Sequence, residues 1–217
     1  MNKVNKKKNV KKTKQAVRRR IVFAIVLVPM TIFIALIFYI GHLFNGNQEV
    51  DRPLIPEEFI PIYKAAEQEF GVPWYLLAAH HRVETIFSTM DPMLSPAGAE
   101  GPMQFMPCTF VGWTHPSCDG LGEGDIPEED KVDPEIIKKY NGYGIDANGD
   151  GKADPWDIED AIFSAANFLS HSGAAEGEVE KAIYTYNHSD QYVEDVLHYM
   201  NLYKEKYVEE DEDDIET

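Results

Sequence analysis

The stretch PWYLLAAHHRVETIF, residues 73–87, decides the fold. Pro73 can open a helix, and the apolar side chains that follow recur three and four residues apart, which predicts one buried stripe. Glu84 lies on the flank of this stripe, four residues after His80. A carboxylate at the margin of a core either pairs with a neighbour, such as Arg82, or keeps its proton through a raised pKa. The stretch predicts a helix and leaves Glu84 to be explained.

Helical patterns continue through most of the remaining C-terminal part of the chain. Residues 88–128 are instead rich in Gly, Pro, Ser and Thr, which predicts loops, and the tail 208–217 is an acidic run expected to be disordered. No alternation typical of strands occurs. We therefore expect a mainly α-helical domain over residues 55–207, with helices in five segments besides the opening one: 56–70, 133–140, 157–173, 176–187 and 189–207.

The N-terminal part predicts a membrane anchor. Residues 1–20 hold ten of the 20 Lys and Arg residues and no acid, and residues 21–44 contain no charged side chain. Those 24 residues exceed the roughly 20 that cross a bilayer. By the positive-inside rule we expect a basic cytoplasmic tail, one transmembrane signal anchor in the cell membrane, a stalk over residues 45–54, and the domain on the outer, cell-wall side.

The rest of the chain is strongly acidic. Residues 21–217 hold ten basic residues against all 37 acidic ones, a formal charge of about −27. No basic groove remains to neutralise phosphates, so we expect no nucleic-acid partner. Cys108 and Cys118 are ten residues apart, and an outside location permits a disulfide between them, although two free buried thiols would fit the sequence as well.

A loop rich in oxygen side chains, DANGDGKADPWD, occupies residues 146–157. Its spacing matches an EF-hand calcium loop, with glycine at the sixth position, where the chain turns sharply. Aspartate replaces the usual glutamate at the twelfth position, which predicts weaker binding. The alternative is a surface turn that binds no metal. The predicted ligands of a structural Ca²⁺ are Asp146, Asn148, Asp150, Lys152 through its backbone carbonyl, Asp154 and Asp157.

Three blocks in one order carry a family resemblance: RVET (82–85), SPAGAEGPMQFMP (95–107) and IYTYNHSDQYVEDVL (183–197). They resemble the lytic transglycosylases of peptidoglycan metabolism, in particular the branch with membrane-bound lytic transglycosylase B and the secreted Gram-positive murein transglycosylases. The resemblance covers roughly residues 55–203, including the acidic loop. It implies a lysozyme-like helical fold and cleavage of the β-1,4 bond between N-acetylmuramic acid and N-acetylglucosamine in peptidoglycan glycan strands.

The resemblance also implies roles for individual residues. Glu84 aligns with the essential glutamate of the family, and the expected sugar contacts are Thr85, Ser95, Met103, Gln104, Phe105, Tyr186 and Asn187. Cys108 stands where the family commonly has Gly or Ser, so the disulfide does not follow from the resemblance.

Glycoside cleavage usually requires two carboxylates, and the matched blocks supply only Glu84. One acid suffices if the muramoyl 2-acetamido oxygen stabilises the oxocarbenium-like centre and Glu84 then takes the proton of the 6-hydroxyl, which yields a 1,6-anhydro sugar. Asp91 or Glu100 could instead serve as a second carboxylate in a hydrolytic muramidase. A non-catalytic module that binds peptidoglycan is the third alternative. Envelope protein partners are not predicted by the sequence.

Overall fold

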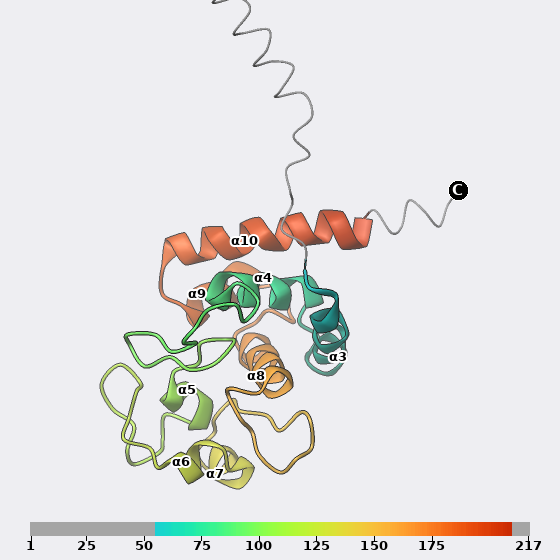
Figure 1. The fold of residues 1–217 in the computed structure, drawn as a ribbon. Coiled ribbons are helices and arrows are strands. Elements are labelled where there is room, and N and C mark those ends of the chain that lie inside the picture. Colours follow the sequence, from blue (N-terminus) through green and yellow to red (C-terminus); the bar gives the residue numbers. More distant parts are fainter. Residues whose placement is uncertain (1–54, 210–217) are drawn as a thin grey trace, which may run out of the picture. The chain divides into compact units, whose positions relative to one another are not determined.

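The computed structural model describes residues 55–209. The predicted basic tail, signal anchor and stalk lie outside the described residues, as do residues 210–217. Between residues 55 and 209, no helix is both long and apolar enough to cross a membrane. In chain order the helical elements of this part are η2 (Glu57–Phe59), α3 (Ile60–Phe70), α4 (Trp74–Thr85), α5 (Pro107–Val111), α6 (Glu128–Lys131), α7 (Pro134–Lys139), α8 (Ile158–His171), α9 (Val179–Tyr186), α10 (Asp190–Lys204) and η3 (Glu205–Glu209) (Figure 1).

The predicted mainly α-helical domain is confirmed. Within the described residues no strand forms, and two isolated β-bridges join Glu100 to Leu94 and to Phe105. Gly71 ends α3 in a left-handed conformation with φ of 71°, and the Ser189 side chain caps α10 by accepting from the Tyr192 backbone N–H. Both helix ends follow from residue chemistry, because glycine tolerates positive φ and serine satisfies an unpaired N–H at a helix start.

α4 is the central helix of the domain. It packs most extensively against α10 and also contacts α3 and α8 (Figure 1). All six side chains of residues 76–81 are completely buried, so the helix is covered on every side rather than along the single stripe that its sequence predicts. Two of these six are histidines, which explains why apolar spacing alone understates the burial. A helix buried all round can hold its last turn, and therefore Glu84, in one place.

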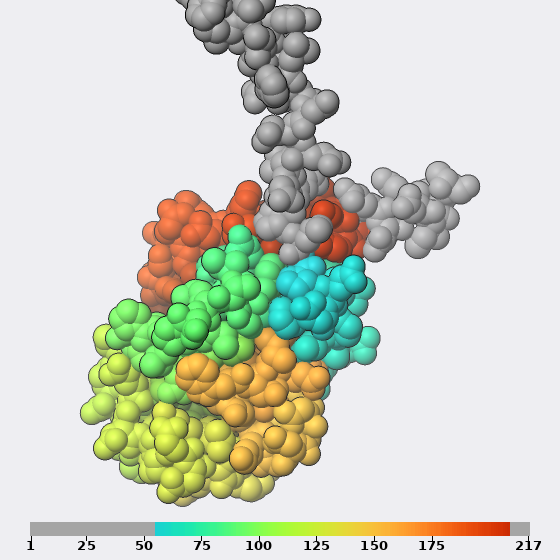
Figure 2. Space-filling model, viewed as in Figure 1, coloured from blue at the N-terminus to red at the C-terminus, as the bar shows by residue number. Residues whose placement is uncertain are grey.

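The short helices α5, α6 and α7 lie at the end of the domain opposite α10 (Figure 1). Within residues 88–128, where the sequence predicts loops, the apolar residues Pro107–Val111 form the short helix α5, which Pro107 opens at its first turn. Cys108 in α5 and Cys118 in the loop after it are joined in a disulfide. In the space-filling view the segment between α4 and α5, coloured green, lies on the surface between α10 and the residues around 120–140 (Figure 2).

Helical structure at the C-terminal end of the domain extends past residue 207. The helical turn η3 continues to Glu209, two residues past the expected end of the domain at 207. Tyr207 and Val208 are partly buried and pack against the core, and the Tyr207 hydroxyl accepts the Ile55 backbone N–H at 3.1 Å. The first and last described segments of the domain are thereby tied together.

Candidate active site

Glu84 lies in the last turn of α4 and is partly accessible to solvent. The Tyr192 hydroxyl, from α10, donates a hydrogen bond to Glu84 Oε1 at 2.5 Å. Burial among protein groups raises the pKa of Glu84 to about 7, and the hydrogen bond from Tyr192 opposes this rise because it stabilises the charged form. A carboxyl group with a pKa near neutrality can both give and take a proton at physiological pH.

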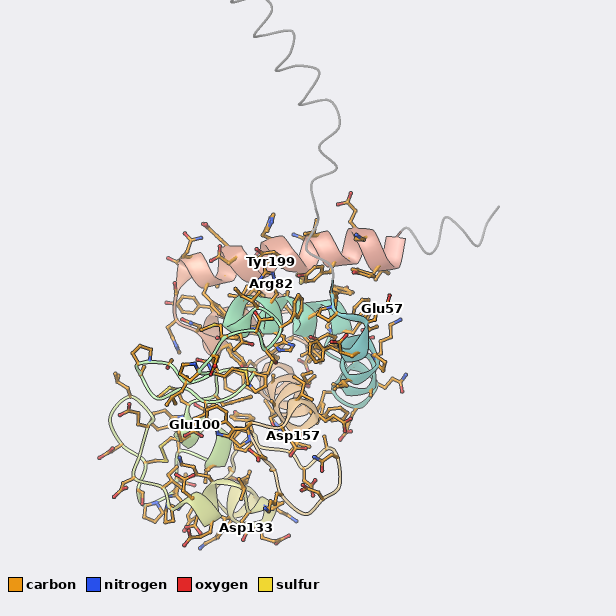
Figure 3. All side chains as sticks on the ribbon, viewed as in Figure 1. Glu57, Arg82, Glu100, Asp133, Asp157 and Tyr199 are labelled. Atoms are coloured by element: carbon orange, nitrogen blue, oxygen red, sulfur yellow. A yellow bond between two sulfur atoms is a disulfide. The ribbon has the colours of Figure 1, made fainter. Side chains whose placement is uncertain are left out.

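Arg82 does not neutralise Glu84. Its guanidinium carbon lies 5.2 Å from the centre of the Tyr199 ring on α10, as the neighbouring labels in Figure 3 illustrate. Among the salt bridges of the described residues, none involves Glu84. Glu84 is therefore not a structural carboxylate paired with Arg82.

Three consecutive left-handed residues follow the last turn of α4. Ile86, Phe87 and Ser88 have φ angles of 54°, 57° and 61°. Thr85, which begins this turn, is completely buried. Its hydroxyl donates to the Pro102 carbonyl at 2.8 Å and accepts the Ser88 N–H at 3.1 Å. The predicted sugar contact for Thr85 is wrong on these grounds: its side chain is sealed in the interior and ties α4 to the loop that contains Pro102.

His81 supports the same turn from inside the domain. Its Nε2 lies 2.7 Å from the Ser88 hydroxyl and its Nδ1 lies 2.7 Å from the Tyr63 hydroxyl on α3. Burial lowers the pKa of His81 to about 3, so the ring is neutral and acts as one donor and one acceptor. The histidine therefore fixes the turn to α3 without introducing charge.

Four more predicted sugar contacts lie in the loop before α5, and two of them, Ser95 and Gln104, bond its backbone. The Ser95 hydroxyl accepts the Ala99 N–H at 2.9 Å, which closes a tight turn. Gln104 has a φ of 51°, and its side-chain amide nitrogen donates to the carbonyls of Met93 at 3.1 Å and Gly101 at 2.9 Å. Because the backbone uses the donor side of Gln104, the group that it can offer a ligand is its carbonyl oxygen.

A cleft of about 380 Å³ adjoins this loop. Three predicted residues lie in its wall: Gln104, Phe105 and Tyr186. Two wall residues that sequence reasoning missed are Trp113 and Leu121, whose side chains are 52% and 84% exposed. Both lie between or just beyond the disulfide-linked cysteines, in loops that carry no motif. An apolar surface of this kind, rimmed by amide and hydroxyl groups, is suited to the faces of sugar rings.

Tyr186 lies between the cleft and Tyr192. It lines the cleft, its ring stacks on that of Tyr192 with centroids 6.5 Å apart, and its hydroxyl donates to the Met103 carbonyl at 2.7 Å. Glu84 itself does not line this cleft. The Met103 side chain itself is completely buried, so its predicted sugar contact is wrong and only its backbone lies at the site. Asn187 is exposed at the end of α9 but does not line the cleft, whereas the next residue, His188, does.

The two candidate second carboxylates lie in unsuitable surroundings. Glu100 accepts a salt bridge from Lys131 at 2.9 Å, and both side chains are largely buried (Figure 3). Asp91 is exposed on the loop after α4. Glu100 is therefore already engaged by a cation, in contrast to Glu84.

The acidic loop abuts the loop before α5. A Cβ on Gly101, whose φ is 77°, would lie 1.8 Å from the Pro155 carbonyl oxygen, so only glycine allows this approach. In the loop, Asp146 accepts the backbone N–H groups of Gly149, Asp150 and Gly151, and Asp157 caps α8 by accepting from the next residues. The loop conformation is thus held in part by its own aspartate side chains.

Asp160, on α8, organises this loop and was missed by sequence reasoning. It is completely buried, and its carboxylate accepts N–H groups from Ala147, Asn148 and Asp154 at 2.8, 3.3 and 2.8 Å. Burial raises its pKa, and these three bonds oppose the rise. Within residues 55–209 no three His, Cys, Asp or Glu side chains form a metal-binding group, so the predicted Ca²⁺ stays a prediction.

Comparison with known proteins gives two matches. The family described as Transglycosylase SLT domain matches residues 136–181, which run from α7 into α9 and do not include Glu84. The L-Ala–D-Glu endopeptidase of Bacillus subtilis (strain 168) is 26% identical over 160 residues, which is 73% of this chain and 45% of that protein. The chain therefore spans less than half the length of this relative. No solved structure matches the chain.

Proposed function

We propose that this chain, which is similar to the Transglycosylase SLT domain over residues 136–181, cleaves the glycan strands of peptidoglycan with Glu84 as its single catalytic carboxyl group. The observation that carries this proposal is the setting of Glu84. Burial raises its pKa to about 7, and no salt bridge of the described residues involves it. It accepts a hydrogen bond from Tyr192, whose ring stacks on that of Tyr186 in the cleft wall.

The chemistry needs Glu84 in both protonation states. As an acid it donates its proton to the oxygen of the β-1,4 bond, and the N-acetylglucosamine end departs as an alcohol. The muramoyl 2-acetamido oxygen stabilises the resulting centre. As a carboxylate, Glu84 then removes the proton of the 6-hydroxyl, whose oxygen attacks the anomeric carbon. The product is a 1,6-anhydro sugar, no water is consumed, and Glu84 regains its proton.

Surrounding residues would hold the sugar rather than react. Tyr186 and Trp113 offer aromatic surface for ring faces, whereas Phe105 is 3% exposed and supports the wall from behind. The carbonyl oxygen of Gln104 can accept from an N-acetyl N–H. Ser95 is the other polar group that the resemblance assigns to this task. The engagement of Glu100 by Lys131 supports a mechanism with one carboxylate over a two-carboxylate muramidase.

The deciding experiment is product analysis of purified peptidoglycan digested by the full-length protein. We expect muropeptides that end in 1,6-anhydro-muramic acid. Glu84→Gln should abolish their release while the protein stays folded, and Glu100→Gln should retain it. Reducing ends would establish a hydrolytic muramidase, and the absence of soluble glycan from folded wild-type protein would leave a binding module. Retained release by Glu84→Gln would refute the assignment.

A cleavage of peptide bonds is the second candidate, because the relative from Bacillus subtilis is named an endopeptidase. The matched part is less than half of that relative, so its peptidase activity need not reside there. The same digest decides this point: new peptide amino termini with intact glycan would favour a peptidase, and we expect intact stem peptides.

Membrane anchoring and calcium binding are proposed on the sequence. Protease treatment of intact cells should degrade the domain, since residues 21–44 would hold it outside the membrane. Titration of the full-length protein with Ca²⁺ in a calorimeter should give binding in the range of extracellular calcium modules, about 0.1–1 mM. Asp146→Ala should lose it, and heat release equal to that of a buffer blank would contradict the proposal.

A further inference from the structure

His80 lies one helical turn before Glu84 on α4, and its side chain is completely buried. Its Nδ1 lies 2.8 Å from the Tyr192 hydroxyl, the same hydroxyl that donates to Glu84 Oε1 at 2.5 Å. The three side chains form a continuous chain of hydrogen bonds from the interior to Glu84. The ring of His80 also lies against those of Tyr186 and Tyr192, with centroids 4.8 and 5.7 Å away.

The Tyr192 hydroxyl has one proton, and this sets the direction of the hydrogen bonds that join His80, Tyr192 and Glu84. When Glu84 is a carboxylate it can only accept, so Tyr192 must donate to it. The contact between His80 Nδ1 and the Tyr192 oxygen is then a hydrogen bond only if Nδ1 carries the donor proton. The opposite tautomer would leave two acceptors competing for one proton and would place an N–H on Nε2.

The surroundings of Nε2 support the same assignment. This atom is buried and has no hydrogen-bond partner among the described residues. A neutral imidazole has one N–H, and burial keeps His80 neutral by lowering its pKa to about 3. A proton on Nε2 would be a buried donor without an acceptor, whereas a proton on Nδ1 is satisfied by Tyr192.

We propose that His80 is a positioning residue, protonated on Nδ1, that acts through Tyr192 to commit the tyrosine proton to Glu84. This proposal rests on the proposed function of Glu84. The tautomer suits both catalytic states, because Tyr192 can donate to Glu84 Oε1 whether Glu84 is a carboxylate or a neutral acid. Catalysis therefore requires no rearrangement of the buried chain between the two steps.

The proposed role of His80 is to limit the rise in the pKa of Glu84 that burial causes. Burial alone pushes Glu84 toward its neutral form, and an acid that never ionises cannot act as the base of the second step. Donation from Tyr192 stabilises the carboxylate and so lowers the pKa of Glu84. A hydroxyl that itself accepts a hydrogen bond is a better donor, so His80 strengthens this effect.

Other titratable groups near Glu84 do not share this role. On α4, Arg82 is directed at the ring of Tyr199, and His81 pairs with Tyr63 of α3. On α9, the Tyr186 hydroxyl donates its hydrogen bond to the Met103 carbonyl. On α10, Tyr192 is the group that contacts Glu84 directly.

The first test reads the tautomer in the unmodified protein. Nitrogen-15 NMR of the full-length chain, labelled on histidine, separates a protonated Nδ1 from a protonated Nε2, and His80→Asn identifies the His80 signals. We expect the proton on Nδ1. A proton on Nε2 would overturn the proposal whether or not any variant folds.

The second test titrates Glu84 by carbon-13 NMR in glutamate-labelled protein, with the signal identified by its loss in Glu84→Gln. Tyr192→Phe should raise the pKa of Glu84 by about one unit or more, and His80→Leu by about half a unit. His80→Asn should stay close to wild type, because the asparagine Nδ2 can donate from the place of Nδ1. An unchanged or lowered pKa in His80→Leu would contradict the proposal.

These readouts do not depend on activity. A protein that titrates as expected but releases no glycan would refute the proposed function and leave the hydrogen-bond chain intact. A protein that releases anhydro products but carries the proton on Nε2 would refute the role of His80 alone.

Discussion

Replacing Glu84 with glutamine should make the protein more stable at neutral and alkaline pH. In the folded protein burial raises the pKa of Glu84 to about 7, from an ordinary value of 4.5. Between these two pH values the unfolded chain releases a proton that the folded protein retains, so the free energy of unfolding falls as the pH rises. Glutamine has nearly the same shape, can still accept from Tyr192, and never ionises.

The size of the effect follows from the two pKa values. A tenfold change in an ionisation constant corresponds to about 1.4 kcal/mol, so the complete change from 4.5 to about 7 sets an upper limit of about 3 kcal/mol. We expect the free energy of unfolding of Glu84→Gln to exceed that of wild type by about 2–3 kcal/mol at pH 8, and the two to be nearly equal at pH 4.5. For a domain of this size that corresponds to a rise in Tm of about 5–10 °C at pH 8.

The assay is urea unfolding followed by tryptophan fluorescence at pH 4.5 and pH 8. All three tryptophans of the full-length chain, Trp74, Trp113 and Trp156, lie in the described domain, so the signal reports on that domain. Glu57→Gln is the matched control, because Glu57 is exposed and its replacement should change neither value. Equal stabilities of Glu84→Gln and wild type at pH 8 would show that Glu84 is not desolvated, and the reasoning would fail.

Three further outcomes are expected. Glycan release should fall as the pH rises through about 7, because the first step needs protonated Glu84; a rate that stays constant to pH 9 would argue against it as the acid. Trp113→Ala should weaken binding to soluble glycan strands by about three- to tenfold in a pull-down titration, whereas Trp156→Ala, exposed outside the cleft wall, should not. Replacing both Cys108 and Cys118 with serine should lower the free energy of unfolding, measured in urea, by about 2–3 kcal/mol. An unchanged value would show that the disulfide does not stabilise the folded protein.

The helices could be predicted because their signals are local. In residues 55–209, apolar spacing located every helix of eight or more residues, and residue chemistry placed ends such as Gly71 and Ser189. The position of Glu84 at a core margin was likewise readable. The errors concern what surrounds a residue: Thr85 looked like a sugar contact and is buried, because whether a short polar side chain faces a cleft depends on the loop that covers it.

Tyr192 and His80 show more clearly that the surroundings of a residue cannot be predicted from sequence alone. The hydrogen bond between Tyr192 and Glu84 joins residues 108 positions apart, and no spacing rule connects them. His80 follows the same helical face as Glu84, so its closeness was predictable, but its function depends on the tyrosine that α10 supplies. Signals within one helix can be read from sequence, whereas a hydrogen-bond chain across two helices requires the packing itself.

The turn after α4 explains why Glu84 stands where a substrate can reach it. Each left-handed residue that is not glycine costs about 1–2 kcal/mol, and three of them follow one another at Ile86, Phe87 and Ser88. A helix that continued regularly would avoid this cost, but it would carry further side chains over the last turn and cover the carboxyl group. The turn is held by Thr85, which bonds Ser88 and the Pro102 carbonyl, and by His81, which bonds Ser88 from within the core. The strain of the left-handed residues is therefore offset by buried polar contacts of His81 and Thr85, on either side of Glu84 in the sequence. These contacts end the helix directly after Glu84.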